Sequence, residues 1–329
     1  MLSRTKVGLV GAGYWGTKLA REYVALSRAD STIRFTALAD RSAGQIVRVQ
    51  SILGSNQLDY FLDYRHLLGQ SRVDAVHIAV PNEQHYIVAS EFLQNGVHVL
   101  LEKPMALTSR EAFDLVELAS KQGLILQIGH VFRFSNALQE AKRLIESGLI
   151  GRPFFLNICW SNYQEPPEGR NIIFDLAPHP IDILNMLLGE WPLRVSTTAR
   201  AYLKKSSGLE DTAFISLEYP EDVTANILLS WARPGPKERS LSISGERGSL
   251  FVDALNEKLT MYDYNNGARV AKVIRNNTIS EMIGHFLKSA SEPTPPLNGG
   301  LAGAHNVRVL EACVQSLKSR ARLRVAPNA

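Results

Sequence analysis

Two groups of polar side chains have the composition of a site for proton transfer. Lys103 follows the apolar run at 98–101, and a lysine where a buried strand ends can hold an alkoxide or lower a neighbouring pKa. Asp175 and His179 are four residues apart, a spacing that places both side chains on one face of a helix. A carboxylate next to an imidazole orients and tunes a general base near neutral pH. These residues are therefore the candidate catalytic groups.

Each group also has a purely structural interpretation. Lys103 could be a surface lysine before a turn, and His179 could cap a helix or lie in the core. His179 precedes a proline, which biases it away from helical geometry. We therefore expect a tight turn into a helix at about 180–188 rather than a regular helix through Asp175. Asp182 then lies near the positive end of that helix.

A glycine-rich turn near the amino terminus provides the strongest binding signal. It fits G-x-G-x-x-G between an apolar strand at 7–10 and a helical pattern at 17–26. The first glycine permits a tight turn, the second lets a pyrophosphate approach bare backbone, and the third lets the helix pack on the strand. Because helix N–H groups attract phosphates, the motif predicts a dinucleotide site rather than an empty turn. The residues assigned to this site are Gly11, Gly13, Tyr14, Trp15 and Gly16.

The end of the next expected strand, at 33–39, bears on which dinucleotide binds. Asp40 follows this strand, 24 residues after Gly16. A carboxylate at this position accepts hydrogen bonds from an adenosine ribose and repels a 2′-phosphate, which favours NAD. Arg41 comes next and could hold that phosphate, so NADP remains the alternative.

The elements around these residues alternate between strand and helix in the first part of the chain. Such alternation predicts an α/β fold with a doubly wound parallel sheet, and we assign 1–124 to an NAD(P)-binding Rossmann domain. Pro81 and Asn82 follow one expected strand, and Glu102 with Lys103 follows the next. Ligands bind outside the carboxyl ends of parallel strands, so these residues join the candidate cofactor site.

The pattern then changes to consecutive strands joined by turns. An open, mostly antiparallel sheet is expected, and 125–329 is assigned to a second domain of α+β type. A segment rich in proline and glycine at 292–303 predicts a loop, and 307–319 a final helix. The strands are expected at 154–163, 194–203, 212–219, 224–231, 241–244 and 249–252.

Composition excludes several classes of protein. At 329 residues the chain is long for a single core, which favours two domains. Its net charge is +4 with scattered Lys and Arg, so no nucleic-acid partner is expected. No apolar run approaches the roughly 18 residues of a membrane span, and the first strand leaves no room for a signal peptide. Cys159 and Cys313 are interpreted as core thiols in a reducing compartment. A cytoplasmic protein without a membrane partner is expected.

The remaining histidines carry less weight. His77 lies in the middle of an expected strand and is interpreted as a packed core residue. No cluster of His, Cys, Asp and Glu has the spacing of a zinc site, so no metal is expected.

Taken together, these motifs resemble those of the glucose–fructose oxidoreductase / inositol dehydrogenase / rhizopine-catabolism (Gfo/Idh/MocA) family. Each motif alone is weak, but their order and distances match, and the likeness covers nearly the whole chain. The motifs are Gly11-Ala-Gly-Tyr-Trp-Gly16, Asp40, Pro81-Asn-Glu-Gln-His85, Glu102-Lys-Pro104, Ile150-Gly-Arg-Pro153, Asp175-x-x-x-His179 and Ser244-Gly-Glu-Arg-Gly-Ser-Leu250.

The resemblance implies hydride transfer between nicotinamide and a hydroxyl-bearing carbon of a small-molecule sugar. Carried over to this chain, Lys103 contacts the reacting hydroxyl. His179 acts as base in oxidation or acid in reduction, with Asp175 orienting it. Asn82 and His85 line the nicotinamide end, and the peptide bond after Lys103 is expected to be cis.

Departures from the family pattern fall on the substrate wall. Ala177 stands where the family usually has glycine, and the proline that often follows Arg133 is missing. The glycine turn and the segment around His179 are most similar to members that oxidise nucleotide-linked amino sugars at C3. The candidate substrate residues are Arg133, Tyr163, Arg170 and Asn171.

The alternatives are a cyclitol (inositol) dehydrogenase and an NAD-dependent redox glycosidase. A non-catalytic NAD(P)-binding regulator is disfavoured, because such a protein would have lost the site residues that this chain keeps. Family analogy makes 125–329 the substrate-binding and oligomerisation domain, and it implies a homodimer or homotetramer formed through the open face of the second sheet.

Overall fold

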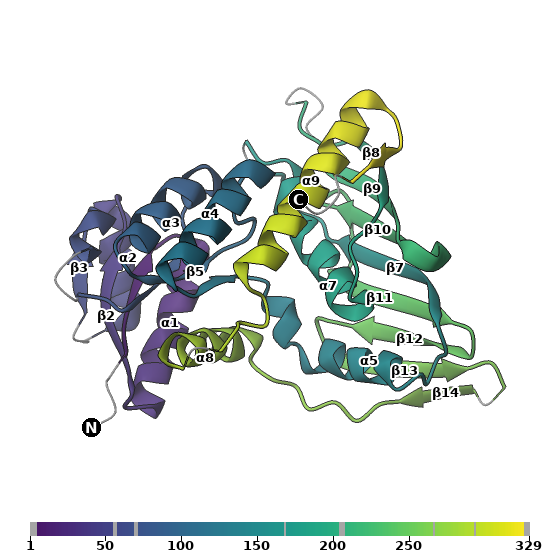
Figure 1. Cartoon of the computed structure of the whole chain (residues 1–329), viewed down its shortest axis with the longest axis horizontal. Helices are drawn as coiled ribbons and strands as arrows, with labels where there is room; N and C mark the ends of the chain where they lie inside the picture. Colours follow the sequence, from purple (N-terminus) through teal and green to yellow (C-terminus); the bar gives the residue numbers. More distant parts are fainter. Residues whose placement is uncertain are drawn as a thin grey trace. The chain divides into compact units, whose positions relative to one another are not determined.

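The computed structural model describes residues 5–54, 58–68, 72–167, 169–203, 208–265, 267–292 and 294–325. Contacts between Cα atoms divide the chain into two compact units (Figure 1). The first unit is Met1–Val131 with Asn277–Ala304, and the second is Phe132–Asn276 with His305–Ala329. The expected boundary after residue 124 differs from this division, because the first unit extends further and regains a segment from the C-terminal part of the chain.

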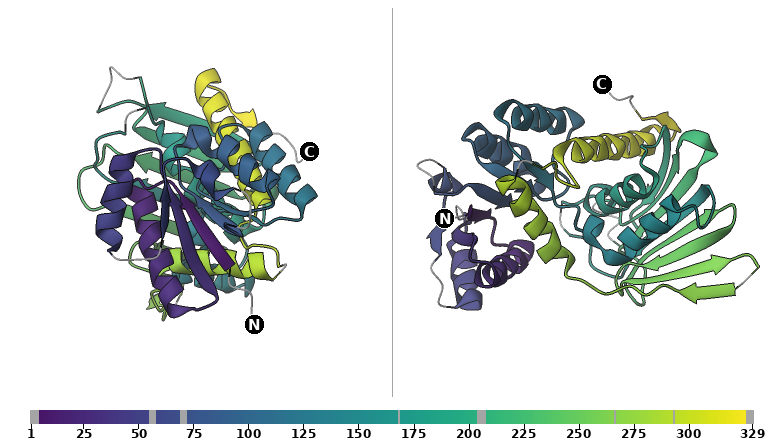
Figure 2. Two further views of the ribbon diagram at one scale, coloured as in Figure 1. Left: turned by 90° about the vertical axis from the view of Figure 1, so that its left-hand side faces the viewer. Right: turned by 60° about the horizontal axis from the view of Figure 1, so that its bottom comes forward.

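The first unit contains a six-stranded sheet in the order β3-β2-β1-β4-β5-β6, counted over the described residues. Its neighbouring strands all pair in parallel, and helices lie on both sides of the sheet (Figure 2). The expected α/β, doubly wound Rossmann fold is confirmed. The strands are β1 (Thr5–Val10), β2 (Ile33–Ala39), β3 (Asp59–Phe61), β4 (Ala75–Ile78), β5 (His98–Leu101) and β6 (Leu126–Ile128). The helices are α1 (Tyr14–Ala29), α2 (Ala43–Leu53), α3 (His85–Gln94), α4 (Ser109–Gln122) and α8 (Thr278–Ser291).

Long-range hydrogen bonds attach the C-terminal segment to this unit. The backbone N–H of Ile128 in β6 donates to the Asn298 carbonyl at 2.9 Å. The buried Gln127 side chain donates to the Met282 carbonyl of α8 at 3.1 Å. The donor and the acceptor of each of these hydrogen bonds belong to the first unit, so β6 and α8 are both part of the Rossmann domain.

Helix α9 (Gly300–Ser319) begins earlier than expected. The prediction of a loop at 292–303 is therefore wrong at its end. A Cβ on Gly300 would lie 2.7 Å from a side-chain carbon of Leu126, so a glycine lets the first turn of the helix approach β6 closely. Packing against the sheet thus decides the structure of a stretch whose composition indicates a loop.

The second unit contains a nine-stranded sheet in the order β14-β13-β12-β11-β7-β10-β9-β8-β15, again over the described residues. The β7–β10 pair is parallel and the other pairs are antiparallel, so the expected mostly antiparallel sheet is confirmed. The expected strands are present, and the sequence analysis missed β3 in the first unit and β13, β14 and β15 here. The strands are β7 (Pro153–Ser161), β8 (Arg194–Arg200), β9 (Thr212–Glu218), β10 (Thr224–Ser230), β11 (Glu238–Gly245), β12 (Gly248–Asp253), β13 (Lys258–Asp263), β14 (Gly267–Val270) and β15 (Leu323–Arg324).

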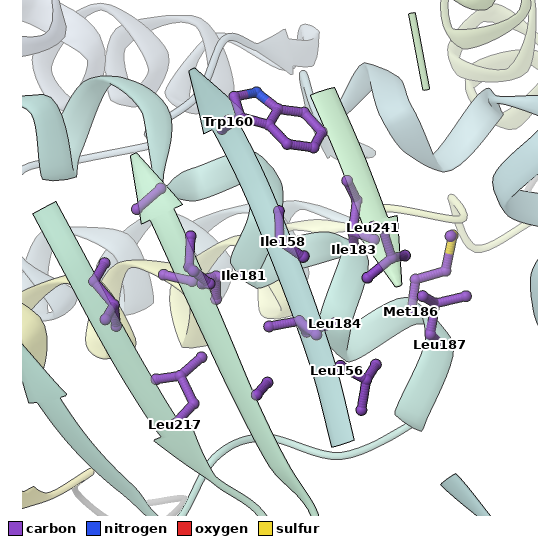
Figure 3. Close-up of a cluster of buried hydrophobic side chains, with 14 of the residues drawn as sticks. Leu156, Ile158, Trp160, Ile181, Ile183, Leu184, Met186, Leu187, Leu217 and Leu241 are labelled. Atoms are coloured by element: carbon purple, nitrogen blue, oxygen red, sulfur yellow. The ribbon is translucent and has the colours of Figure 1, made fainter. Parts of the chain in front are cut away.

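The core of the second unit lies between one face of this sheet and its helices (Figure 3). These helices are α5 (Asn136–Glu146), α6 (Ile172–Leu176), α7 (Pro178–Leu188) and the later part of α9. Alternate residues of β7, namely Leu156, Ile158 and Trp160, face the core, where they join Leu184 of α7. This alternation fixes which strand residues face the helices and which face outward.

Composition also raises expectations about the cysteines, about metal sites and about membrane helices. Both Cys159 and Cys313 are free thiols, and Cys313 is buried. Among the described residues, no three His, Cys, Asp or Glu side chains gather in a way that could hold a metal ion. No helix in this part of the chain has the length and hydropathy needed to cross a membrane.

Candidate active site

The glycine turn has the backbone that a bound pyrophosphate requires. Gly11 has a φ of +104°, and a Cβ there would lie 2.2 Å from the Ala79 carbonyl oxygen. A Cβ on Gly16 would lie 1.9 Å from the Gly11 carbonyl oxygen, so this glycine lets α1 start against the end of β1. A Cβ on Gly13 would meet nothing within 4 Å. Bare backbone thus faces open space at the start of α1, which fits the phosphates of a dinucleotide.

Asp40 lies where β2 ends and is tied to this turn. Its carboxylate accepts hydrogen bonds from the backbone N–H groups of Ala12 at 2.7 Å and Ser42 at 2.8 Å. A carboxylate has about four acceptor sites, so capacity remains for ribose hydroxyls. Arg41 is exposed. The arrangement fits the adenosine ribose of NAD, as the residue types predict.

The first turn of α1 exposes Tyr14 and directs Trp15 inward. The Tyr14 ring is 71% exposed, and the ammonium of Lys18 lies 4.4 Å from its centroid. The Trp15 indole N–H donates a hydrogen bond to Oε1 of Glu102 at 2.6 Å. The two aromatic residues of the motif therefore have different surroundings, although the sequence analysis gave them one assignment.

The ends of β4 and β5 are held together around Lys103. Pro81 and Asn82 follow β4, and the half-buried Lys103 follows β5, with a cis peptide bond to Pro104 as expected. The buried His85 ring places Nδ1 2.7 Å from the Pro104 carbonyl oxygen, and Nε2 lies 3.0 Å from the carbonyl oxygen of Val80, which precedes Pro81. Burial lowers the pKa of His85, although both carbonyls favour its protonated form. In this position the ring supports the turn around Lys103.

In the second unit, His179 lies in the first turn of α7 against aromatic rings. The His179 ring meets Phe132 edge to face, with centroids 5.1 Å apart, and Phe132 meets Trp160 in the same way at 5.0 Å. The Asn306 side chain donates to the Pro178 carbonyl at 2.9 Å and anchors the start of this helix. The imidazole is therefore half-buried and supported on one side by an apolar wall.

Asp175 lies in a short helix that the sequence analysis did not expect. Helix α6 ends at Leu176, and Ala177, with φ −64° and ψ −24°, connects it directly to α7. The expected turn in place of a helix through Asp175 is therefore wrong. The two prolines of α7 fall in its first turn, where missing N–H groups leave no intrahelical bond unmade. Tertiary burial of Ile172 and Ile173 then holds the preceding segment helical.

The four candidate substrate residues have contrasting surroundings. Arg170 donates to the Asp175 carboxylate at 3.3 Å, and Tyr163 is 63% exposed. The Asn171 side chain caps α6 by accepting from Ile173 N–H at 2.8 Å, while its amide donates to Glu210 at 2.5 Å.

Arg133 is buried in an ion pair. Its guanidinium donates to both carboxylate oxygens of Asp182, at 2.8 and 2.9 Å, and to the Asn185 side chain at 2.8 Å. Asp182 is only 1% exposed. Its carboxylate therefore pairs with Arg133 in the core of the unit, and the pair connects Arg133 to α7. Separation of the two partners would leave an uncompensated buried charge, so the ion pair holds α7 in place.

The expectation that His77 is a packed core residue is confirmed, because its side chain is fully buried, but its polar partners were missed. Its imidazole lies 3.3 Å from Glu102 and 3.2 Å from the hydroxyl of Tyr23. The signal was the register of two neighbouring parallel strands, because His77 of β4 pairs with Leu100 of β5, two residues before Glu102. Side chains two residues apart on a strand share a face, so His77 and Glu102 meet.

Two sequence families match the chain. Residues 5–130 match the family described as "Oxidoreductase family, NAD-binding Rossmann fold". Residues 138–251 match the "GFO/IDH/MocA C-terminal domain". The first match agrees with the geometry of the glycine turn, and the second falls on the sheet and helices of the second unit.

Characterised relatives extend the likeness over most of the chain. UDP-N-acetylglucosamine 3-dehydrogenase from Acidithiobacillus ferrooxidans is 28% identical, over 94% of this chain and 95% of that protein. Inositol 2-dehydrogenase 2 from Saccharopolyspora erythraea is 30% identical, over 82% and 79%. 2,7-Anhydro-N-acetylneuraminate hydratase from Escherichia coli is 28% identical, over 75% and 67%. The solved structure of the Acidithiobacillus enzyme has a TM-score of 0.85 at 26% identity, covering 96% of this chain and 98% of that chain. The chain therefore belongs to the Gfo/Idh/MocA family of NAD-binding oxidoreductases.

Proposed function

We propose that this oxidoreductase is a dehydrogenase that oxidises C3 of a UDP-linked amino sugar with NAD. The observation that carries the proposal is the likeness to UDP-N-acetylglucosamine 3-dehydrogenase, which spans 94% of this chain and 95% of that protein. The inositol dehydrogenase has slightly higher identity but matches over 82% and 79%. The match to the nucleotide-sugar enzyme covers nearly all of both chains. It therefore includes nearly all of the second unit, where the proposed substrate residues lie, and this favours the nucleotide sugar.

The proposed chemistry removes two hydrogens from the alcohol, one as a hydride from the carbon and one as a proton from the hydroxyl oxygen. NAD, when bound, supplies the acceptor for the hydride that leaves the carbon. The ammonium of Lys103 holds the hydroxyl oxygen and lowers its pKa, since a nearby cation favours the charged form. The His179 imidazole accepts the hydroxyl proton, and the alcohol becomes a ketone. Asp175 orients the imidazole of His179. The glycine turn, together with Asp40, holds the adenosine diphosphate part of the cofactor.

Two other substrate classes follow from named relatives. The inositol dehydrogenase supports a cyclitol substrate. The hydratase of an anhydro sugar is named for an addition of water and not for a net oxidation, which is compatible with a redox glycosidase that regenerates its cofactor in each turnover. Both use the same cofactor turn, so the substrate distinguishes them. NADP is the alternative cofactor because Arg41 is exposed next to Asp40.

A substrate screen tests the proposal. UDP-N-acetylglucosamine, free aldoses and inositols are incubated with the protein and either NAD or NADP, and reduced cofactor is followed by absorbance. We expect reduction of NAD with the UDP-linked sugar. Reduction with inositol alone would contradict the substrate, and faster reduction of NADP would contradict the cofactor. Conversion of a glycoside without net NADH would favour the redox glycosidase.

Variants test the two catalytic assignments. Lys103→Ala and His179→Ala are each expected to lower kcat by about 10²–10⁴-fold, the usual effect of losing an acid–base group. Lys121→Ala and His66→Ala remove exposed residues of the same types and are expected to retain full activity. Steady-state rates of NADH formation are compared after thermal melting has confirmed that each variant is folded. Unchanged rates for the first pair would contradict the proposed roles.

The open face of the second sheet is proposed to form a homodimer or homotetramer. Strand alternation directs Phe214, Phe251 and Tyr262 away from the helix-covered core, and these rings are 53%, 40% and 46% exposed. Exposed aromatic side chains on one face are typical of an association surface. A cytoplasmic location is also proposed, supported by the two free thiols, and cell fractionation tests it.

Solution mass measures the association. We expect light scattering to give a dimer or tetramer for the wild type and a smaller species for the double variant Phe214→Glu and Phe251→Glu, because two carboxylates would be buried without partners. Leu62→Glu, at a residue 58% exposed in the first unit, is the matched control and should leave the mass unchanged. A monomeric wild type at micromolar concentration would refute the proposal.

A further inference from the structure

A row of four buried or half-buried side chains links α1, β4 and the end of β5 in the first unit. The Tyr23 hydroxyl lies 3.2 Å from Nδ1 of His77, and Nε2 of His77 lies 3.3 Å from Oε1 of Glu102. The indole N–H of Trp15 donates to the same Oε1 at 2.6 Å. Tyr23 and His77 are fully buried, and Glu102 is 7% exposed. We call this row the Tyr23–Trp15 network.

The donors of this network all point toward Glu102. An indole N–H can only donate, so Oε1 of Glu102 is an acceptor. His77 Nε2 faces the same oxygen and must carry a proton to bond with it. In a neutral imidazole Nδ1 is then an acceptor, and the Tyr23 O–H donates to it. The bond to Glu102 therefore fixes the tautomer of His77 and the direction of the whole row.

The network stabilises a buried negative charge next to Lys103. Burial raises the pKa of Glu102, but the hydrogen bonds from His77 and Trp15, together with the charge of Lys103, outweigh it and leave the pKa below its usual value. Burial, followed by the charge of Glu102, raises the pKa of Tyr23 well above its usual value. At neutral pH, Glu102 is ionised and Tyr23 keeps the proton that it donates.

Glu102 is also enclosed by the backbone around it. A Cβ on Gly129 would lie 2.7 Å from Oε2 of Glu102, so a glycine leaves room for the carboxylate. The Glu102 N–H donates to the Ile78 carbonyl at 3.0 Å. On the other side of Lys103, the His85 ring is bonded to the Pro104 carbonyl. Lys103 is thus held by fixed residues before and after it.

The hydrogen bond between Trp15 and Glu102 joins two functionally different places. Trp15 lies in the first turn of α1, two residues after Gly13, where the phosphates of a dinucleotide fit. Glu102 directly precedes Lys103 at the end of β5. A shift of the first turn of α1 therefore moves the indole N–H that holds the carboxylate, and with it the backbone of Lys103.

We propose that the Tyr23–Trp15 network couples dinucleotide binding at the glycine turn to the placement of Lys103, with His77 and Tyr23 as positioning residues. Neither residue touches the turn or Lys103 directly; both act through Glu102. The proposal rests on the proposed function of Lys103, but it does not depend on the identity of the sugar.

The test uses ADP-ribose, which fills the adenosine diphosphate site and lacks the nicotinamide that could cover Lys103 directly. The rate at which acetic anhydride labels Lys103 is measured by mass spectrometry on the full chain, with and without saturating ADP-ribose. We expect ADP-ribose to change the wild-type rate by about fivefold, the lower end of typical coupling between two sites. Labelling of the exposed Lys121 serves as the internal control and should not change.

Two variants at one position separate positioning from stability. His77→Leu removes the donor to Glu102 and should abolish most of the response, whereas His77→Gln keeps an N–H near the same place and should restore it. Tyr23→Phe removes a single hydroxyl and should reduce the response, and it carries the test if His77→Leu does not fold. A merely structural role would lower the melting temperature and leave the response to ADP-ribose intact.

The outcomes distinguish this inference from the proposed function. Calorimetric binding of ADP-ribose without any change in Lys103 labelling would overturn the inference alone, as would a wild-type response in His77→Leu or in Tyr23→Phe. Failure of ADP-ribose to bind would overturn it together with the dinucleotide site. Failure of every sugar to reduce NAD, with the labelling response intact, would contradict only the proposed substrate.

Discussion

The close approach of Gly16 to the Gly11 carbonyl oxygen determines the geometry of the first unit's site. A Cβ at Gly16 would lie 1.9 Å from that oxygen, so any other residue would push α1 away from β1. This contact sets the direction in which α1 starts, and therefore where Gly13 presents bare backbone and where Trp15 reaches Glu102. A dinucleotide site and a hydrogen bond to Glu102, the residue before Lys103, follow from a single steric constraint.

The parallel sheet brings the other parts of this site together. Because neighbouring strands run in the same direction, the residues after β1, β2, β4 and β5 collect at one edge. Asp40 holds the turn through Ala12, and His85 holds the residue after Lys103. These polar side chains at the edge therefore hold the neighbouring backbone in addition to facing a ligand. Their role follows from their contacts and could not be derived from their residue types alone.

The second unit achieves the same rigidity by different means. The ion pair between Arg133 and Asp182 fixes α7, and the rings of Phe132 and Trp160 support His179 from one side. A helix held in this way limits the movement of its imidazole, which suits the general-base role proposed for His179. The charged groups that fix α7 are buried, while Arg170 and Tyr163 remain exposed.

Local sequence was sufficient where local chemistry decides the structure. The glycine turn and the place of Asp40 were predictable from residue types and motif spacing, whereas the cis bond after Lys103 was expected from the family resemblance alone. The return of α8 to the first unit and the early start of α9 at Gly300 were not predictable, because they depend on contacts with residues more than a hundred positions away.

Candidate roles followed the same division. Sequence placed Arg133 on the substrate wall, but its partner Asp182 lies 49 residues away and was assigned to the helix end instead. His77 is a core residue, as expected, and the register of β4 and β5 in addition places it beside Glu102. The role of a titratable residue inside a strand can therefore be predicted only when the register of the neighbouring strand is known.

Binding of NAD to the wild type and to Gly13→Val tests the central claim, that the glycine turn holds a dinucleotide. Gly13 has φ −63° and its Cβ would meet nothing within 4 Å, so valine should leave the melting temperature unchanged. It would fill the space that the pyrophosphate needs and should weaken binding at least about tenfold, or 1.4 kcal/mol. Gly284→Val, also facing open space, on α8, is the control. Calorimetry that gave equal NAD affinities for the wild type and Gly13→Val would contradict the account.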